Sequence, residues 1–389
     1  NGRSQLEEAE NATLTGKSDQ LFFTRVRDLL TGHSPEGAAV ETTILPAVQD
    51  AAWQALGDQQ GAVVAIEPST GRILALVSTP GFDPNQLAVH ATSAAGDAYA
   101  ALATADGNPL RSNATQERYA PGSTFKLVTA AAALGSGRYA PDTQVAAPRE
   151  LSLPHTTATI QNFGGESCGG DTVTLLHALE VSCSTAFAQL GMDLGADAIA
   201  AQAKAFGFGD ASLTIPMTVA QSVFPGGLDA PMTAQSAIGQ RDVQATPLQM
   251  AMVAAGIANG GVVMRPYLVQ TVRAADLSVV SDAKPQQYST AMTPANAAAL
   301  RDMMVDVVQH GTGTAAQVPG VPVAGKTGTA QTTDTAAPHA WFTAFAPADS
   351  PQVAVAVLVE HGGSMGNDAT GGRVAATIAK AVIEAVLGR

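Results

Sequence analysis

The feature that most constrains the fold of this chain is the placement of its β-rich runs on either side of a long helical stretch. An early pair of runs covers residues 61–78, and the turn residues Pro68-Ser69-Thr70-Gly71 join the pair as in a hairpin. Three further runs lie near the C-terminus, at 321–330, 339–347 and 352–361. Helix-like segments lie between and after them, at 123–137, 172–206, 246–258, 294–309 and 373–387. This order predicts one antiparallel sheet with helices packed on it, which is an α+β fold.

Two stretches depart from that pattern. Residues 1–40 interleave charged and apolar side chains, and they predict a small non-catalytic module of short helices, one of them over 22–30. Residues 82–120 are rich in Asn, Pro, Thr and Ala with little periodicity, and they predict loops. A length of 389 residues allows about two domains. We therefore expect the small module at 1–40 and one large domain at 41–389.

The charge of the chain excludes one class of partner. There are 33 Asp and Glu residues against 20 Lys and Arg, which gives a formal net charge of −13. Binding to nucleic acid requires clustered basic residues that neutralise phosphates, so we expect no nucleic-acid partner. The longest uncharged run, from Val243 to Met264, contains too many polar residues to span a bilayer. The chain begins at Asn1 without Met, so we expect a targeting or anchoring segment to precede it.

The cysteines and histidines predict no metal site and no cofactor. Cys168 and Cys183 have no His or further Cys at metal-ligand spacing. The seven histidines show no H-E-x-x-H pattern and no paired spacing. A disulfide between the two cysteines and a pair of buried free thiols are equally compatible with their positions alone.

Ser123-Thr124-Phe125-Lys126 is a candidate nucleophilic site. Residues three apart share a helix face, so the Ser123 hydroxyl and the Lys126 amine can meet. Serine is a weak nucleophile at neutral pH and needs a base, and a lysine can act as that base when burial or a nearby cation lowers its pKa. The simpler alternative is a helix-capping serine followed by a surface lysine, since S-x-x-K is a common sequence.

The run Lys326-Thr327-Gly328-Thr329 is a candidate site for an anionic substrate. It combines a cation and hydroxyls with a glycine that lets a ligand backbone approach. Residues 320–327 also match the phosphate-binding pattern G-x-x-x-x-G-K-[ST]. That pattern must open a helix, whereas Pro322 and the GTAQTTDTAAP stretch after Thr327 predict none, so we expect no nucleotide site.

A third constellation is Ser182-Cys183-Ser184. Alone, these small polar residues are typical of contacts between helices. Cys183 is a poor candidate for a nucleophile, because its surroundings are apolar and the only nearby histidine is His177.

Taken together and in this order, Ser-x-x-Lys, Ser-x-Ser and Lys-Thr-Gly resemble the motif set of the penicillin-recognising serine enzymes. The surrounding sequences YAPGSTFK, AIGQ followed by ATPLQMA, GKTGTAQ and HAWFTAFAP resemble class B penicillin-binding proteins, the monofunctional peptidoglycan transpeptidases. The hairpin and the FDPN sequence after it fit the same family, so the resemblance covers about residues 41–389. The module at 1–40 is similar to that of the penicillin-binding protein A subgroup.

The resemblance implies a fold with a five-stranded antiparallel sheet flanked by helices and an all-helical subdomain, with the active site between them. It implies that Ser123 attacks the D-Ala-D-Ala carbonyl of a stem peptide, that Lys126 takes its proton and that Ser182 relays a proton to the leaving amine. The Lys-Thr-Gly run would complete the site: Lys326 tunes the electrostatics, Thr327 and Thr329 hold the substrate carboxylate around Gly328, and the N–H groups of Ser123 and Thr329 form the oxyanion hole.

The chain departs from the family at Ser184, where the family has Asn. Asparagine offers both a donor and an acceptor, whereas serine offers one hydroxyl, so we expect slower acylation than with Asn. The family is extracytoplasmic, which favours a disulfide between Cys168 and Cys183 that tethers the loop before the second motif.

The resemblance also implies partners and a location. We expect peptidoglycan stem peptides as substrates, β-lactams as covalent ligands of Ser123, a membrane glycosyltransferase as partner, and a location on the extracytoplasmic face of the bacterial membrane, with a transmembrane anchor preceding Asn1. Two alternatives stay open: a D,D-carboxypeptidase or β-lactamase in which water deacylates, and a catalytically weakened scaffold or antibiotic sensor, which Ser184 alone favours.

Overall fold

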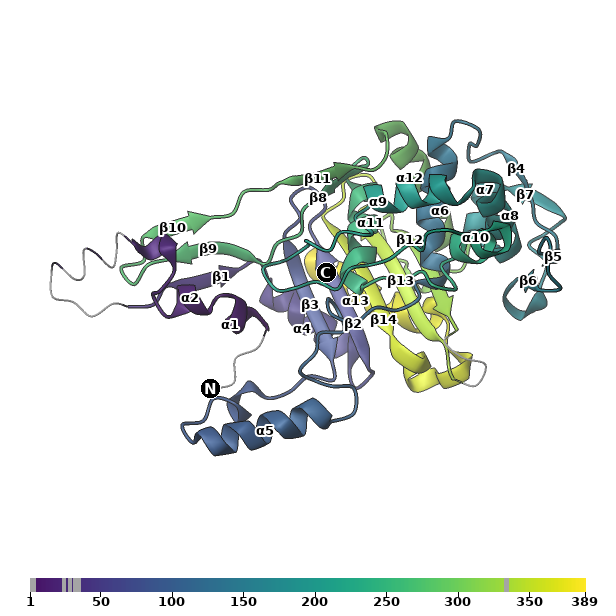
Figure 1. Ribbon diagram of the computed structural model, residues 1–389. Coiled ribbons are helices and arrows are strands. Elements are labelled where there is room, and N and C mark those ends of the chain that lie inside the picture. The colour runs from purple at the N-terminus through teal and green to yellow at the C-terminus, as the bar shows by residue number, and fades with distance from the viewer. Residues whose placement is uncertain (1–4, 23–25, 27–29, 31–35, 332–335) are drawn as a thin grey trace.

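The protein is built around a five-stranded antiparallel sheet, which occupies the middle of the computed structural model (Figure 1). The structure describes residues 5–22, 26, 30, 36–331 and 336–389. The strands follow the order β12-β13-β14-β2-β3, so the late strands pair with the early hairpin. Their bounds are β2 (Gly61–Ile66), β3 (Ile73–Thr79), β12 (Ala324–Ala330), β13 (His339–Ala346) and β14 (Val353–Val359). The predicted antiparallel sheet is therefore confirmed, and the strand β12 lies at one of its edges.

Both faces of the sheet are buried, which explains the uninterrupted apolar strands. Along β14, Val355 and Val357 point to one face and Ala354, Ala356 and Leu358 to the other, as the two-residue period of a strand requires. The first face packs against α4 (Pro46–Leu56) and α13 (Ala376–Val386), and the second packs against α11 (Pro247–Ala258). Every residue of α11 from Pro247 to Ile257 is buried, as expected for a helix in the middle of a core.

A helical subdomain covers the edge strand β12 and lies at the right of Figure 1, drawn in blue, teal and green. Its central helix is α6, in which every residue from Lys126 to Leu134 is buried. The helices are α6 (Lys126–Gly135), α7 (Leu175–Glu180), α8 (Ser184–Leu194), α9 (Ala196–Ala205), α10 (Ala230–Ala237) and α12 (Pro294–Gln309). Two small hairpin-like sheets join them: β4 (Gln144–Ala146) with β7 (Thr172–Thr174), and β5 (Glu150–Ser152) with β6 (Thr159–Gln161).

Short helical turns connect these elements. They are the 3-10 turns η2 (Pro84–Gln86), η3 (Gly122–Phe125), η4 (Phe163–Gly165), η5 (Thr314–Ala316) and η6 (Glu360–Asp368), and the π turn η7 (Gly371–Ala375). Within the described residues, no helix combines the length and the apolar composition needed to cross a bilayer.

Two predicted segments were wrong in detail. The helix expected over 172–206 is instead β7 followed by α7, α8 and α9, because Ser182 and Gly195 adopt positive φ angles of 60° and 83° and interrupt it. The loop expected over 82–120 contains a surface helix, α5 (Thr92–Thr104), in which only Ala95 is buried. Alanine is a strong helix former, but alanine alone gives little hydrophobic periodicity to recognise.

The N-terminal residues pack with a segment from much later in the chain, at the far side of the sheet from the helical subdomain (Figure 1). The strand β1 (Ala39–Thr42) pairs with β9 (Val269–Arg273), which also pairs with β10 (Val279–Asp282). A second pair, β8 (Val262–Met264) and β11 (Gln287–Thr290), leads to and from this sheet. The short helices before β1 are α1 (Gln5–Ala9), α2 (Asn11–Leu14) and the 3-10 turn η1 (Asp19–Leu21).

A small core of Leu21, Ala38 and Val272 joins the described N-terminal residues to β9. Most of the helix expected over 22–30 lies outside the described residues. The boundary between residues 40 and 41 stays a prediction.

Candidate active site

Ser123 lies in the turn η3, which runs directly into α6, and it stands three residues before Lys126, the first residue of that helix. The glycine before it makes this turn possible: Gly122 has a φ of 51°, and a Cβ atom there would lie 2.8 Å from the carbonyl oxygen of Thr329. The turn is thereby pressed against the edge strand β12. Ser123 is half-buried, whereas Lys126, on the same helical face, is fully buried.

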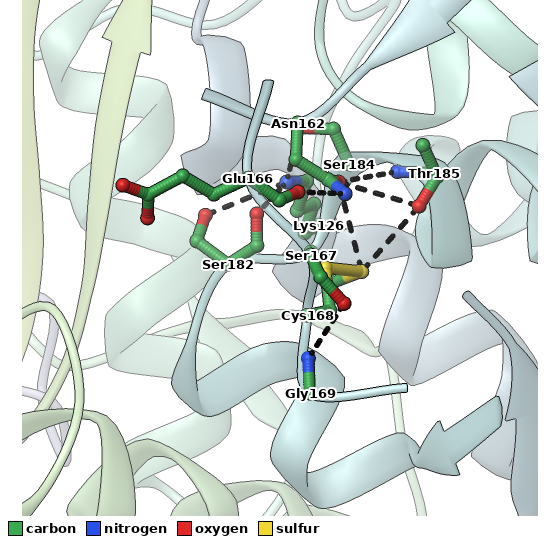
Figure 2. Close-up of a disulfide and its surroundings, with 10 residues drawn as sticks. Lys126, Asn162, Glu166, Ser167, Cys168, Gly169, Ser182, Ser184 and Thr185 are labelled. Atoms are coloured by element: carbon green, nitrogen blue, oxygen red, sulfur yellow. Dashed lines mark hydrogen bonds between the residues drawn. A yellow bond between two sulfur atoms is a disulfide. The ribbon is translucent and has the colours of Figure 1, made fainter. Parts of the chain in front are cut away.

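The amine of Lys126 points at the turn between α7 and α8 (Figure 2). Its Nζ donates to the carbonyl oxygen of Ser182 at 2.7 Å and to the hydroxyl of Ser184 at 3.1 Å. The hydroxyl of Ser182 lies 3.4 Å away. Ser184 therefore supplies an acceptor to Lys126 despite being shorter than the family's Asn.

Lys326, on the edge strand β12, also contacts Ser182. Its Nζ donates to the Ser182 hydroxyl at 2.7 Å and to the carbonyl oxygen of Thr327 at 3.0 Å, and its side chain is fully buried. The Ser182 hydroxyl is thus within hydrogen-bond distance of two buried amines that come from different parts of the fold.

Burial changes the proton affinity of both amines. It lowers the pKa of Lys326 to about 7, because an ammonium group loses its hydration there. Burial also lowers the pKa of Lys126 well below its ordinary value, and the nearby charge of Lys326 lowers that pKa further. Lys126 is therefore the better candidate for a neutral amine that accepts a proton, and Lys326 for the amine that keeps its charge.

Ser182 lies in a strained turn that neighbouring groups support. Ser182 has a φ of 60°, a conformation that non-glycine residues seldom adopt without surrounding support. The next residue, Cys183, forms a disulfide with Cys168 (Figure 2). The side chain of Asn162 supports the same region, because its Oδ1 accepts from the backbone N–H of Thr185 at 3.0 Å.

The edge strand β12 supplies the remaining groups. The hydroxyl of Thr327 lies 2.7 Å from that of Thr312. A Cβ atom on Gly328 would lie 3.0 Å from the Pro121 carbonyl oxygen, so only glycine lets the turn before Ser123 approach the strand this closely. Thr329 is partly exposed and lies beside Gly122.

The structure thus brings the three motifs together: Ser123 and Lys126 on η3 and α6, Ser182 and Ser184 on the α7–α8 turn, and Lys326 to Thr329 on β12. Sequence reasoning missed Asn162 and Thr312. Neither stands in a recognisable motif, and each reaches the site only because the chain folds a loop or a helix end against it.

Two other sequence patterns have no role in this geometry. Lys326 and Thr327 lie inside a strand that continues to Ala330, so the phosphate-loop pattern does not open a helix. Within the described residues, no group of three or more His, Cys, Asp or Glu side chains could hold a metal ion.

A buried lysine beside a serine, a second lysine on an edge strand and a five-stranded antiparallel sheet define the class of penicillin-recognising serine enzymes. The comparisons agree with this class. Residues 61–384 match the penicillin binding protein transpeptidase domain, and residues 1–40 match the penicillin binding protein A dimerisation domain. The chain belongs to the penicillin-binding protein transpeptidase family, in the PbpA subgroup of class B.

Similar proteins are found among both sequences and structures. The chain is 49% identical over 391 residues to a protein of Mycolicibacterium smegmatis named peptidoglycan D,D-transpeptidase PbpA, with 98% of this chain and 79% of that protein covered. It is similar to penicillin-binding protein A from M. tuberculosis in its ceftriaxone acyl-enzyme complex, at a TM-score of 0.95 and 44% identity over 99% of this chain and 88% of that one. The penicillin G acyl-enzyme complex of the same protein gives a TM-score of 0.93 and 45% identity over 99% and 89%.

Proposed function

We propose that this protein is a peptidoglycan D,D-transpeptidase that cross-links stem peptides through an acyl-enzyme on Ser123. The observation that carries the proposal is the convergence of two buried lysines, Lys126 and Lys326, on the hydroxyl of Ser182 beside the Ser123 turn. Family membership supports it, as does the similarity to structures that are themselves β-lactam acyl-enzymes.

In the acylation step, the Oγ of Ser123 attacks the carbonyl carbon between the two D-Ala residues of a stem peptide. The neutral amine of Lys126 takes the serine proton as the new C–O bond forms. Ser182 donates its hydroxyl proton to the leaving nitrogen as the C–N bond breaks and regains a proton from the Lys126 ammonium group 3.4 Å away, and the terminal D-Ala departs. The depressed pKa of Lys126 supports its role as the base, since an ordinary lysine would be protonated at neutral pH.

The edge strand β12 is the candidate for substrate binding. Thr327 and Thr329 would hold the terminal carboxylate, beside the charge of Lys326. The backbone N–H groups of Ser123 and Thr329 would stabilise the negative oxygen that develops on the carbonyl, usually a large contribution to acyl transfer. The close approach of Gly122 to the Thr329 backbone supports this pairing, because it brings the two N–H groups into one region.

In the second step, an amine from a neighbouring stem peptide attacks the ester carbonyl. The new C–N bond is the cross-link, the C–O bond to Ser123 breaks, and the amine proton passes through Lys126 to the serine oxygen. A β-lactam mimics D-Ala-D-Ala and stops at the acyl-enzyme. The carboxypeptidase and scaffold alternatives have less support. Ser184, the one residue that favoured a weakened scaffold, accepts a hydrogen bond from Lys126, so the second motif remains connected to the base.

The cellular setting is part of the same proposal. The protein would act on the extracytoplasmic face of the membrane, held there by a transmembrane segment and working beside a membrane glycosyltransferase that polymerises the glycan strands. Residues 1–40 would be part of a non-catalytic pedestal below the transpeptidase domain at 41–389, which the match to a dimerisation domain supports.

The proposal is tested by intact mass spectrometry after incubation with a penicillin. We expect one stable adduct on the parent protein and none on Ser123→Ala, with the adduct mapped to Ser123 by peptide digestion. Slow loss of the adduct would favour a transpeptidase over a β-lactamase. An adduct that persists on Ser123→Ala, or no adduct on the parent, would overturn the assignment of Ser123 as the nucleophile.

A further inference from the structure

The four residues before Ser123 are held from several directions. Tyr119 exchanges two backbone hydrogen bonds with Ala245, at 3.0 and 2.9 Å. The indole N–H of Trp341 donates to the carbonyl oxygen of Ala120 at 3.0 Å, and the N–H of Gly122 donates to Gly239 at 2.9 Å. The segment is therefore fixed by neighbours on the sheet and on the helical subdomain.

The side chain of Tyr119 adds a buried polar contact to this arrangement. Its hydroxyl donates to Oε1 of Glu360 at 2.8 Å. The ring meets His339 and Trp341 edge to face, with centroid distances of 5.3 and 6.3 Å. Tyr119 is 9% exposed and Glu360 8% exposed, so the hydrogen bond is largely shielded from water.

Glu360 is itself anchored to the central sheet. It follows the last residue of β14, and its backbone N–H donates to the carbonyl oxygen of Gln60 at 2.8 Å. The amide of Gln60 donates to the second carboxylate oxygen, Oε2, at 3.2 Å. Both carboxylate oxygens therefore have partners, and Tyr119 is linked to the sheet through Glu360.

Burial of the Glu360 carboxylate costs stability, which suggests that the residue has a role other than stabilising the core. A buried carboxylate loses hydration, and an apolar side chain of similar size usually stabilises a core at least as well. Burial raises the pKa of Glu360, while the Tyr119 hydroxyl and the nearby His361 oppose that rise; Glu117 is the other carboxylate that acts on it. Burial also lowers the pKa of His339, to about 4, so this neighbour is neutral at physiological pH.

We propose that Tyr119 and Glu360 are positioning residues, which fix the backbone before Ser123 relative to the sheet that carries β12. The inference rests on the proposed role of Ser123 as nucleophile. The two N–H groups proposed for the oxyanion hole belong to different elements, η3 and β12, so their separation depends on how firmly the Ser123 segment is tied to the sheet. A hydrogen bond from Tyr119 to a residue at the end of β14 provides that tie.

Loss of the Tyr119–Glu360 hydrogen bond should lower the rate of acylation rather than the affinity for the ligand. Neither side chain is among the groups proposed to touch the ligand, so loss of their hydrogen bond should leave ligand affinity nearly unchanged. A small displacement of the nucleophile or of an oxyanion donor lowers the rate steeply. We therefore expect Tyr119→Phe and Glu360→Ala to lower the first-order acylation rate constant by about tenfold, with the dissociation constant changed by less than about twofold.

The test measures both constants by stopped-flow with a fluorescent penicillin, at a temperature well below the melting point of every variant. Glu360→Gln is the conservative variant: its amide oxygen can accept from Tyr119, and Gln60 can turn its own amide to match. We expect Glu360→Gln to restore the rate constant to within about threefold of the parent. The rescue separates positioning from a general loss of packing.

Tyr288→Phe is the matched control. It removes the same chemical group, a tyrosine hydroxyl that donates to a carboxylate, here Asp210 at 3.0 Å, but on β11 outside the site. We expect the parental rate constant for this variant. A parental rate constant for Tyr119→Phe, an equal loss in Tyr288→Phe or no rescue by Glu360→Gln would each overturn the proposal.

Peptide mapping of the adduct in every variant separates this proposal from the assignment of the nucleophile. An adduct on a residue other than Ser123 would overturn the proposed function itself. If Glu360→Ala fails to fold, the comparison of Tyr119→Phe with Tyr288→Phe decides the matter alone.

Discussion

Lys326 donates a hydrogen bond of 2.7 Å to the hydroxyl of Ser182, a residue 144 positions earlier in the chain. The contact joins the edge strand of the sheet to the turn between α7 and α8, and the amine of Lys126 lies 3.4 Å from the same hydroxyl. Simultaneous protonation of Lys126 and Lys326 is unfavourable, because burial and the repulsion between two ammonium groups both disfavour a second positive charge in the site. The acid–base properties of the site follow from this contact.

The first prediction concerns the pH dependence of acylation. Burial and the nearby charge of Lys326 both lower the pKa of Lys126, so the acylation rate should increase as this amine loses its proton. Lys326, with its pKa of about 7, then loses its charge, and the rate should fall above that pH. The measurement is the second-order acylation constant between about pH 5 and 9. A rate that stays constant above pH 7 would contradict the role of charged Lys326, and Lys326→Ala should lack the alkaline decline.

The second prediction concerns Ser184. Its hydroxyl accepts from Lys126 but offers fewer hydrogen bonds than the asparagine of the family. We expect Ser184→Asn to raise the acylation rate constant by about fivefold or more, and Ser184→Ala to lower it, since an intramolecular hydrogen bond contributes about 0.5–1.5 kcal/mol. The two variants, measured with the same penicillin, bracket the parent. Equal rates for Ser184→Asn and the parent would contradict the prediction, because they would show that the Ser184 hydroxyl supports Lys126 as well as an asparagine does.

The third prediction concerns the disulfide of Cys168 and Cys183, which closes a loop across a sequence separation of 15. A loop of this size is expected to stabilise the folded state by about 3 kcal/mol, chiefly by restricting the unfolded chain. Cys168→Ser should lower the free energy of unfolding by about that amount, and it should slow acylation because the turn at Ser182 loses a tether. Urea denaturation with and without a thiol reductant checks this: only the parent should respond to the reductant.

The fourth prediction concerns Thr312, whose hydroxyl lies 2.7 Å from that of Thr327. Thr312→Val removes the hydroxyl that orients Thr327 toward the substrate carboxylate. We expect the dissociation constant of the penicillin to rise about fivefold, the equivalent of about 1 kcal/mol for one hydrogen bond, with the first-order rate constant little changed. Thr312→Ser should behave like the parent. A decrease in the first-order rate constant with an unchanged dissociation constant would contradict this prediction and would indicate that Thr312 acts in the chemical step.

The fifth prediction concerns stability and Glu360. Burial raises the folded-state pKa of Glu360 above its ordinary value of 4.5, so the ionised carboxylate favours the unfolded state. Its contribution to stability is therefore greatest below that value and declines as pH rises through the folded-state pKa. Glu360→Gln removes the titrating group, and we expect it to be at least as stable as the parent at neutral pH. The difference in urea midpoint between the two proteins should shrink toward acid pH, and a variant less stable than the parent at pH 7 would contradict this.

The sequence was sufficient to predict the class of fold and the position of the chemistry. The strands β2, β3, β13 and β14 are nearly continuous apolar runs bounded by turn residues, and a strand buried on both faces often has that composition. The helices α11 and α12 lie at the residues where the sequence predicted helices. Ser123, Lys126 and Lys326 were recognisable because the motifs that carry them are local.

The sequence could not predict the groups that act through long-range contacts. The break at Ser182 depends on a turn that its neighbours support, and local propensity favoured a continuous helix. Asn162, Thr312 and Glu360 stand in no motif, and each acquires its partner from an element distant in the chain.

What the sequence determined alone is therefore the set of reactive side chains, the helix that carries Lys126 and the strand that carries Lys326, since these follow from residue type and local pattern. The tertiary structure decided which of those side chains meet and how strongly each holds its proton. The physical reason is that a pKa depends on burial and on nearby charges: the amine of Lys326 has an ordinary pKa of 10.5 in water and one of about 7 here, because the fold encloses it beside Ser182.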